Sequence, residues 1–257
     1  MAIRFLTDYP VAFIPEKKTL VIAELHLGLE YQLYKSGITI PPQGERFKEI
    51  LDKLIEETKS KILIIVGDIK HKVPGSTIRE DKEIPKFLNY LKEKIKVVLV
   101  KGNHDDRIEE IIPEGVKICS SRGLKLGSYG FFHGHAWPSK KLMNCDYLFM
   151  GHIHPAIEFK DQFGYRFVLH VWLKGELNKE LIKKKFKIKK TGKMITIILP
   201  TFNNILGGMA VNKIAKEKVI GPLLKNKIFD VENSDIYLLD GTHLGKMKNL
   251  KPKYHSI

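Results

Sequence analysis

The feature that most constrains the fold is a repeated pattern in which a short apolar run ends in a polar loop. Such runs begin at Thr19 (TLVIAELHLG), Lys61 (KILIIVGD) and Lys96 (KVVLVKGNHDD), and each reads as a buried strand. Apolar residues recur at helical spacing from Gln43 to Lys59, and a second helix is expected from Asp81 to Lys94. Strands that alternate with helices predict βαβ units and a mainly parallel sheet.

The pattern changes in the second half of the chain. Glycines interrupt the short apolar runs that follow Val116, which predicts hairpins, and further buried strands are expected from Tyr147 onward. We therefore expect an α/β fold of two packed, mixed β-sheets flanked by helices. Residues 1–257 are expected to form one domain, with a motif-bearing core at 19–155 and a β-rich part at 156–257.

Polar residues of one chemical kind follow the expected strands. Five motifs occur in order along the chain: Glu24-Leu25-His26, Gly67-Asp68, Gly102-Asn103-His104-Asp105, His133-Gly134-His135 and Gly151-His152-Ile153-His154. Ligands of open α/β sheets bind at the carboxyl ends of the strands, where these motifs would meet. Each motif alone is weak, because Gly-Asp is an ordinary turn signal. Together, their carboxylates, imidazoles and amide suit Mn, Fe, Zn, Co or Ni.

The motif order resembles that of a known family. The calcineurin-like metallophosphoesterases carry the series D-x-H, G-D, G-N-H-D/E, H-G and G-H-x-H, which this chain matches up to His154 except that Glu24 stands in place of the first Asp. A narrower resemblance, to the prokaryotic ICC-like phosphoesterases, rests on AELHLG, GDIKH, HGHAWP and GHIHP. It also rests on LPTFNNILGGMAVN from Leu199 and DIYLLDGTHLG from Asp235, and so extends over nearly the whole chain.

The resemblance implies two divalent metal ions. Manganese is the leading candidate, with Fe, Zn, Ni or Co as alternatives. The implied metal ligands are Glu24, His26 and His154 for the first ion, Asn103, His133 and His152 for the second, and Asp68 as a bridge between them.

Residues beside these ligands are expected to handle the substrate. The resemblance implies that His104 faces the leaving group as a catalytic residue, that Asp105 orients His104, and that His135 lines the pocket. Lys70 and His71 follow Asp68 after one intervening residue. They are expected either to contact the substrate phosphate or to lie in a solvated loop.

The chemistry explains why such residues would be grouped. A phosphodiester repels anionic nucleophiles, and two cations about 3.5–4 Å apart neutralise it and bind the attacking and developing oxygens. They also lower the pKa of a bridging water, so that hydroxide forms near neutral pH. A carboxylate such as Asp68 can reach both cations, and His104 can give a proton to the leaving alkoxide. The expected activity is metal-dependent hydrolysis of a phosphodiester, with a phosphomonoester as the alternative substrate.

The net charge of +15 indicates a polyanionic partner such as a nucleotide or nucleic acid, although a lysine-rich solvated surface would look the same. Eight lysines lie between Lys179 and Lys193. The part from Lys183 to Lys190 is expected to be an edge strand protected by lysines, with a nucleic-acid contact as the alternative. No apolar stretch reaches the roughly 18 residues that span a membrane, and a cytoplasmic location is expected.

Two other functions stay open at this stage. One is a binding module that kept the fold and lost the chemistry, for which Glu24 is the single supporting residue. The other is a nuclease subunit of a DNA repair complex, which would bind DNA in a strongly salt-dependent way. The sequence does not fix the oligomeric state.

Overall fold

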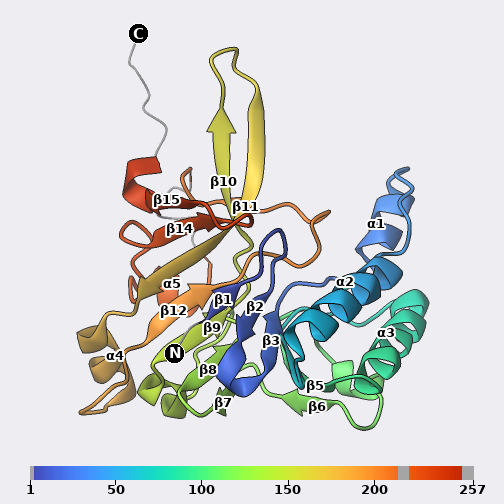
Figure 1. The fold of residues 1–257 in the computed structure, drawn as a ribbon, viewed down its shortest axis with the longest axis horizontal. Helices are drawn as coiled ribbons and strands as arrows, with labels where there is room; N and C mark the ends of the chain where they lie inside the picture. The colour runs from blue at the N-terminus through green and yellow to red at the C-terminus, as the bar shows by residue number, and fades with distance from the viewer. Residues whose placement is uncertain (1–2, 214–219, 251–257) are drawn as a thin grey trace.

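Two β-sheets pack face to face between helices in the computed structural model, which describes residues 3–213 and 220–250 (Figure 1). The helices α2 (Gln43–Thr58) and α3 (Ile78–Lys92) cover the outer side of one sheet, with α1 (Leu29–Lys35) beside them. The helices α4 (Lys179–Phe186) and α5 (Pro222–Lys225) lie beside the other sheet. This is the α/β architecture of two mixed sheets flanked by helices that the sequence predicts, and the prediction is confirmed.

The first sheet carries the strands that the opening motifs follow. In spatial order its strands are β1 (Arg4–Phe5), β2 (Ala12–Ile14), β3 (Thr19–Ile22), β4 (Ile62–Val66), β5 (Lys96–Val100) and β6 (Lys117–Cys119). The strands β3 to β6 run parallel, whereas β1 and β2 are antiparallel at one edge. The parallel order places the carboxyl ends of β3, β4 and β5 side by side.

The second sheet combines parallel and antiparallel pairs. Its main path runs through β13 (Met209–Ala210), β10 (Pro155–Lys160), β11 (Arg166–Glu176), β12 (Ile195–Ile198), β9 (Tyr147–Met150), β8 (Tyr129–Phe132) and β7 (Leu124–Leu126). Two further strands, β14 (Asp235–Leu238) and β15 (His243–Lys246), extend it from β11. The hairpin expected after Val116 forms between β7 and β8. The expectation is wrong for β6, which joins the first sheet parallel to β5.

The helices are short apart from two that cover the first sheet. The α-helices are α1 (Leu29–Lys35), α2 (Gln43–Thr58), α3 (Ile78–Lys92), α4 (Lys179–Phe186) and α5 (Pro222–Lys225), and the 3-10 helices are η1 (Pro15–Lys17), η2 (Ile108–Glu110), η3 (Lys140–Asn144) and η5 (Met247–Leu250). Within the described ranges, no helix is long and apolar enough to cross a membrane.

The lysine-rich segment from Lys179 to Lys193 has a different structure from the one expected. The edge strand expected from Lys183 to Lys190 is wrong, because the chain forms α4 up to Phe186. The side chain of Asn178 caps this helix by accepting hydrogen bonds from two backbone N–H groups of its first turn. Ile182 is buried and Phe186 packs against the same core, so the two residues place one apolar face of α4 on the second sheet.

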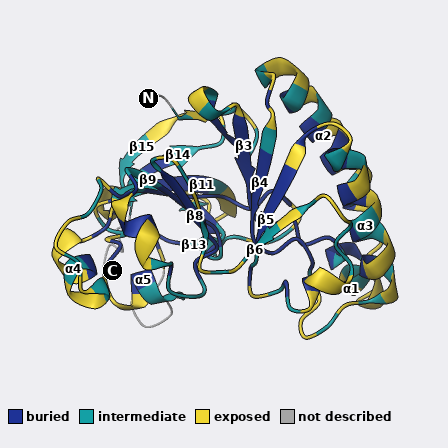
Figure 2. Cartoon of the chain, turned by 90° about the horizontal axis from the view of Figure 1, so that it is seen from below, coloured by how far each residue is buried: buried dark blue, intermediate teal, exposed yellow. Residues whose placement is uncertain are grey.

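Successive side chains along the strands of the first sheet point alternately into two hydrophobic cores, one on each face of the sheet. On β3, Leu20 and Ile22 face α2 and α3, where they meet Phe47 and Phe87, whereas Val21 packs toward the second sheet. Figure 2 shows the resulting buried strands between helices whose outer faces are exposed. Burial on both faces holds the strand ends rigidly, and the candidate site lies on these ends.

Candidate metal centre

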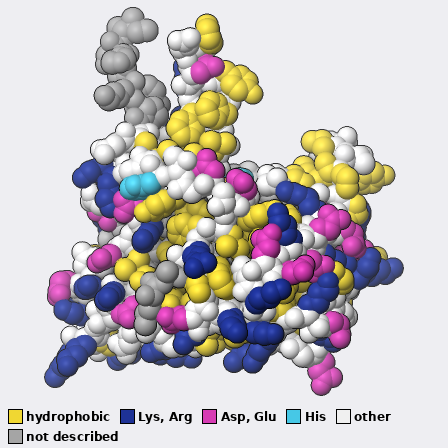
Figure 3. Space-filling view, viewed as in Figure 1, with side chains coloured by type: hydrophobic (Ala, Val, Ile, Leu, Met, Phe, Trp, Pro, Cys, Tyr) yellow, Lys and Arg dark blue, Asp and Glu magenta, His cyan; other side chains and the backbone are white. Residues whose placement is uncertain are grey.

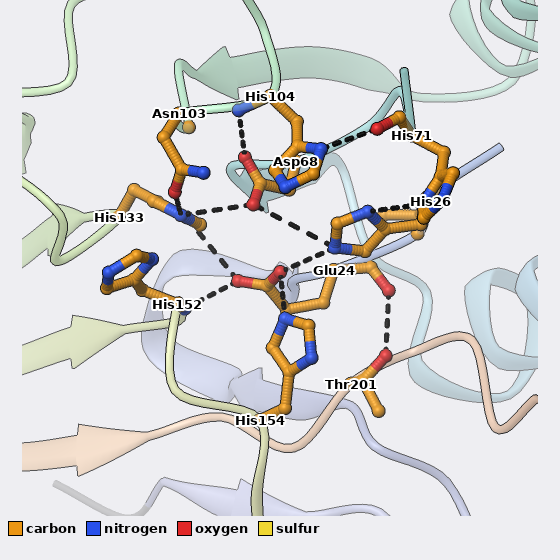
Figure 4. Close-up of polar contacts among 12 residues, drawn as sticks. Glu24, His26, Asp68, His71, Asn103, His104, His133, His152, His154 and Thr201 are labelled. Atoms are coloured by element: carbon orange, nitrogen blue, oxygen red, sulfur yellow. Dashed lines mark hydrogen bonds and ion pairs between the residues drawn. The ribbon is translucent and has the colours of Figure 1, made fainter. Parts of the chain in front are cut away.

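The five motifs meet at one end of the two sheets (Figure 4). Glu24 and His26 follow β3, Asp68 follows β4, and His104 follows β5. The second sheet supplies the histidines that follow β8 and β9. Both sheets therefore contribute to a single cluster of carboxylates and imidazoles.

Left-handed backbone marks the loops of this cluster. The φ angles are 62° at Glu24, 43° at His26, 53° at Asp68, 74° at His152 and 43° at His154. Residues other than glycine rarely adopt this region, and the surrounding structure must hold them there. Such strained positions are concentrated at functional sites.

The first donor group surrounds the buried carboxylate of Glu24. One oxygen, Oε2, lies 2.7 Å from Nε2 of His154 and 3.0 Å from Nε2 of His26. The other, Oε1, accepts the backbone N–H of His152 at 2.5 Å. Burial alone would raise the pKa of Glu24, but the imidazoles of His154 and His133 lower it well below its ordinary value. The carboxylate is therefore anionic, as a metal ligand must be.

The second donor group surrounds Asp68. Its Oδ2 lies 3.3 Å from Nε2 of His133 and 3.8 Å from Nε2 of His26, and the Oδ1 of Asn103 lies 3.1 Å from the same nitrogen of His133. Nδ1 of His133 lies 3.1 Å from the carbonyl oxygen of Val66, so Nδ1 donates its proton there and Nε2 faces the cluster. Burial opposes charge on His133, but Glu24 and Asp68 raise its pKa to about 9.

Two further histidines stand beside this group. The ring of His152 lies 5.1 Å from that of His133 between centroids, and burial together with His133 lowers the pKa of His152 to about 4. The ring centroid of His135 lies 5.2 Å from that of His133. His135 and Asn103 both line a cavity of about 650 Å³. Its Nδ1 is buried without a hydrogen-bond partner in the described structure. A role for His135 in substrate binding stays a prediction.

His104 lies at the edge of the cluster against His26 and His71. Its backbone N–H donates to Oδ1 of Asp68 at 2.9 Å, and its ring lies 4.8 Å from that of His26. Nδ1 of His104 donates to the carbonyl oxygen of His71 at 2.5 Å, which leaves Nε2 as the reactive nitrogen. The side chain of His71 is half-buried and contacts His26 at 3.3 Å and Gln32 at 2.5 Å, so one side of its ring faces the cluster.

Asp105 does not orient the imidazole of His104, contrary to expectation. Its buried carboxylate accepts the backbone N–H groups of Asp68 and Gly102 at 2.8 Å, of Ile69 at 3.0 Å and of Lys70 at 3.4 Å. These bonds tie the loop after β4 to the loop after β5. Burial, with the nearby Asp68 carboxylate, raises the pKa of Asp105 to about 6.

Lys70 is also placed differently from the expectation that it contacts substrate. The side chain is buried, and its ammonium donates to the carbonyl oxygens of Lys72 and Gly75 at 2.6 and 2.7 Å and to Asp106 at 2.5 Å. All three donors are used. Lys70 therefore fastens the loop that carries Asp68 and has no donor left for a phosphate.

Two positioning residues lie outside the five motifs. The hydroxyl of Thr201 donates to the carbonyl oxygen of Glu24 at 2.9 Å (Figure 4), and the side chain of Asn203 donates to that of Leu25 at 3.0 Å. Both lie in the segment LPTFNN, which carries part of the narrower resemblance but contains no charged or imidazole group. Their contribution is to hold the strained loop after β3.

The donor atoms fit divalent cations. Three groups bring ligand atoms within 4.8 Å of one another: Glu24 with His26 and His154, Glu24 with Asp68 and His133, and His26 with His71 and His104. The ion pairs of Glu24 and Asp68 in the described residues are all with imidazoles, and no lysine or arginine balances these buried carboxylates. A site of two carboxylates, several imidazoles and an amide oxygen suits a borderline divalent metal.

The chain is thus an α/β sandwich with a cluster of carboxylates and imidazoles at its strand ends that can hold divalent metal. Residues 17–141, just under half of the chain, match the calcineurin-like phosphoesterase family. This match and the donor cluster together support a metal-dependent phosphoesterase. No curated protein sequence matches the chain.

One solved structure with the same fold is the crystal structure of Pseudomonas putida nuclease MPE. The two chains are 20% identical, the match covers 93% of this chain and 92% of that one, and the TM-score is 0.55. The agreement over almost the full length of both chains extends the likeness in fold beyond residue 141.

Proposed function

We propose that this chain hydrolyses phosphodiesters with two divalent cations bridged by Asp68. The observation that carries the proposal is the position of that carboxylate, whose Oδ2 lies 3.8 Å from the ligand nitrogen of His26 and 3.3 Å from that of His133. It thus stands between the two donor groups. When bound, the cations would neutralise the phosphoester and activate a water between them.

The protein's own residues supply positioning and a proton. Asp105 and Lys70 hold the loop of Asp68, and Asp68 in turn accepts the backbone N–H of His104. The carbonyl oxygen of His71 accepts from Nδ1 of His104 and so holds the ring with Nε2 turned away from that contact. Nε2 of His104 would then donate a proton to the leaving oxygen, as a general acid.

A diester is favoured over a monoester by two observations. The chain has a net charge of +15, which attracts extended polyanions over long range. The structural neighbour from Pseudomonas putida is a nuclease, which makes nucleic acid a substrate to assay. Manganese is the proposed metal, because imidazole and carboxylate ligands together suit it.

The rival function, a binding module without activity, is opposed by the same geometry. It rested on Glu24, and the carboxylate of Glu24 contacts both His26 and His154 at hydrogen-bond distance. The carboxylate of Glu24 thus lies where a metal-binding carboxylate would need to lie, beside the two imidazoles of the first donor group.

A substrate and metal panel tests the proposal. Metal-stripped protein would be reconstituted with Mn, Ni, Co, Zn or Mg and assayed on bis-p-nitrophenyl phosphate, p-nitrophenyl phosphate, cyclic nucleotides and single- and double-stranded DNA. Hydrolysis of diesters, strongest with manganese and absent without metal, is expected. Turnover of monoesters alone would contradict the diester proposal, and full activity after metal removal would contradict the metal-dependent mechanism.

A further inference from the structure

His71 contacts two imidazoles of the metal centre in two different ways (Figure 4). Its carbonyl oxygen accepts the Nδ1 proton of His104 at 2.5 Å, and its own Nδ1 lies 3.3 Å from Nδ1 of His26. On the other side of the ring, Nε2 of His71 lies 2.5 Å from Oε1 of the exposed Gln32. A chain of hydrogen bonds therefore leads from the surface, through His71, to an imidazole of the first donor group.

The direction of each hydrogen bond in this chain follows from Gln32. A carboxamide oxygen can only accept, so Nε2 of His71 carries the proton that Gln32 receives. A neutral imidazole has one N–H group and one lone pair, so Nδ1 of His71 is then an acceptor. Nδ1 of His26 donates to it, which leaves the lone pair of His26 on Nε2.

Nε2 is the nitrogen of His26 that faces the carboxylates of the cluster. It lies 3.0 Å from Oε2 of Glu24 and 3.8 Å from Oδ2 of Asp68. Without an acceptor at Nδ1, the proton of His26 would instead sit on Nε2, where these anionic oxygens attract it and where it blocks a metal ion. A histidine that binds metal commonly donates its other N–H to an oriented partner. For His26, the structure provides His71 in that place.

The backbone holds His71 firmly in this position. Its N–H donates to Oε1 of Glu80 at 2.9 Å and to the carbonyl oxygen of Leu27 at 3.0 Å. Glu80 is buried, and its side chain also caps the first turn of α3. Gly28 begins α1 against Glu80 with a φ of 100°, and a Cβ at Gly28 would lie 2.6 Å from the Glu80 side chain. Close packing of two helix starts thus fixes the ring of His71.

Gln32 lies in the first turn of α1, at the edge of the molecule. Figure 3 shows hydrophobic side chains gathered over α1 and the loop after it, where Tyr34 and Ile38 are 62% and 52% exposed. The helix therefore stands out from the body of the protein, and Gln32 connects it to the metal centre.

We propose that Gln32 and His71 form a relay that keeps the proton of His26 on Nδ1 and leaves the lone pair of Nε2 free for the first metal ion. The inference rests on the proposed function, because it takes His26 as a ligand of that ion. Both relay residues act through His26 and are positioning residues. Since His71 also holds His104 through its carbonyl oxygen, one residue sets the spacing between a metal ligand and the proposed acid.

Paired substitutions separate hydrogen bonding from packing. His71→Asn and His71→Leu have side chains of nearly the same shape, but the asparagine oxygen stands at the same point along the side chain as Nδ1, whereas leucine has no acceptor. At the other end of the relay, Gln32→Glu keeps an accepting oxygen and Gln32→Leu removes it. The matched control is Gln162→Leu, at another exposed glutamine, in the turn between β10 and β11.

Calorimetric titration of zinc into each metal-free protein measures affinity. Proton NMR of the zinc-loaded proteins detects the hydrogen-bonded imidazole N–H of His26 as a separate signal, and circular dichroism checks folding. Diester hydrolysis is assayed on the same samples, so that the relay and the proposed function are judged separately.

His71→Leu should weaken one zinc site about 10- to 100-fold and lose the N–H signal, whereas His71→Asn should keep both. Gln32→Leu should lose less, because water can reach this exposed position, and Gln32→Glu and Gln162→Leu should bind zinc at least as tightly as wild type. A folded His71→Leu that binds zinc as wild type does, or a folded His71→Asn that binds as weakly as His71→Leu, overturns the relay.

The two proposals fail in different ways. If the expected differences in zinc affinity appear but the wild type hydrolyses no diester, the relay stands and the proposed function is wrong. If the wild type hydrolyses diesters and His71→Leu keeps full zinc affinity and the N–H signal, the proposed function stands and the relay is wrong. A wild type that binds no zinc or other divalent metal overturns both.

Discussion

Shortening Glu24 by one methylene tests whether this site is built around a glutamate. The change Glu24→Asp withdraws the carboxylate by about 1.5 Å. Its Oε2 now lies 2.7 Å from His154 and 3.0 Å from His26, so both contacts would move beyond hydrogen-bond range. The family pattern has Asp at this position, and a simple expectation from the pattern would be that aspartate improves the site.

The backbone cannot follow the shorter side chain inward. The N–H of Glu24 donates to the carbonyl oxygen of Gly67 at 3.2 Å, and its own carbonyl oxygen accepts from Thr201 at 2.9 Å and from the N–H of Asn203 at 3.2 Å. We therefore expect metal affinity at the first donor group to fall about 10- to 100-fold. A ligand misplaced by about 1 Å can also lower kcat about a hundredfold.

Titration of manganese into metal-free protein, with hydrolysis of bis-p-nitrophenyl phosphate followed in parallel, measures both quantities. The control is Glu30→Asp, which removes one methylene from another buried glutamate, one that bonds the N–H of Gln43 at 3.3 Å outside the cluster. It should leave metal affinity and kcat close to wild type. A Glu24→Asp protein that binds metal as tightly as wild type, or turns over faster, would refute the reasoning.

Three further predictions follow from the same geometry. His104→Ala should keep its metal and lose about 10²–10⁴-fold in kcat, and the loss should be smaller for nitrophenyl esters than for alkyl esters; equal losses would speak against a general acid. Asp105→Asn should lower the free energy of unfolding by about 1–3 kcal/mol, because an amide NH2 replaces one of the two oxygens that accept backbone N–H groups and leaves those groups without an acceptor; an unchanged denaturant midpoint would contradict this. The pKa of His133 is raised to about 9, and a nitrogen that binds metal must be unprotonated. Metal affinity should therefore rise about tenfold per pH unit for each proton displaced, as the pH increases toward 9. Calorimetry at several pH values measures this affinity, and an affinity that does not change with pH would contradict the prediction.

The sequence predicts the helices and strands that show a hydrophobic period or a continuous apolar run ending in a polar loop. The buried runs that begin near Thr19, Lys61 and Lys96 form β3, β4 and β5, because continuous apolar runs have few other solutions in a parallel sheet. The edge strand expected from Lys183 to Lys190 is wrong, because lysines that alternate with Phe186 and Ile188 resemble a protected edge strand in sequence. The helix that forms instead depends on the cap at Asn178 and on the tertiary burial of Ile182, which local pattern does not reveal.

For the candidate site, residue types and order predict which side chains meet, but not which hydrogen bonds they make. Asp105 belongs to one of the motifs and Lys70 lies two residues after Asp68, yet both side chains turn into the protein to bind backbone groups. Thr201 holds Glu24 from 177 residues away. Such contacts depend on how two sheets pack, and no local spacing in one sequence encodes them.

The bridging role of Asp68 is tested most directly by counting metal. Wild-type protein and Asp68→Asn would each be reconstituted with excess manganese, freed of loose metal and analysed by mass spectrometry for metal per chain, with diester hydrolysis measured on the same samples. Two ions per wild-type chain are expected, with fewer than two and no hydrolysis in Asp68→Asn, because a neutral amide cannot replace a carboxylate shared by two cations. Two tightly held ions in Asp68→Asn, or a wild type fully active with one, would contradict the bridged two-metal site.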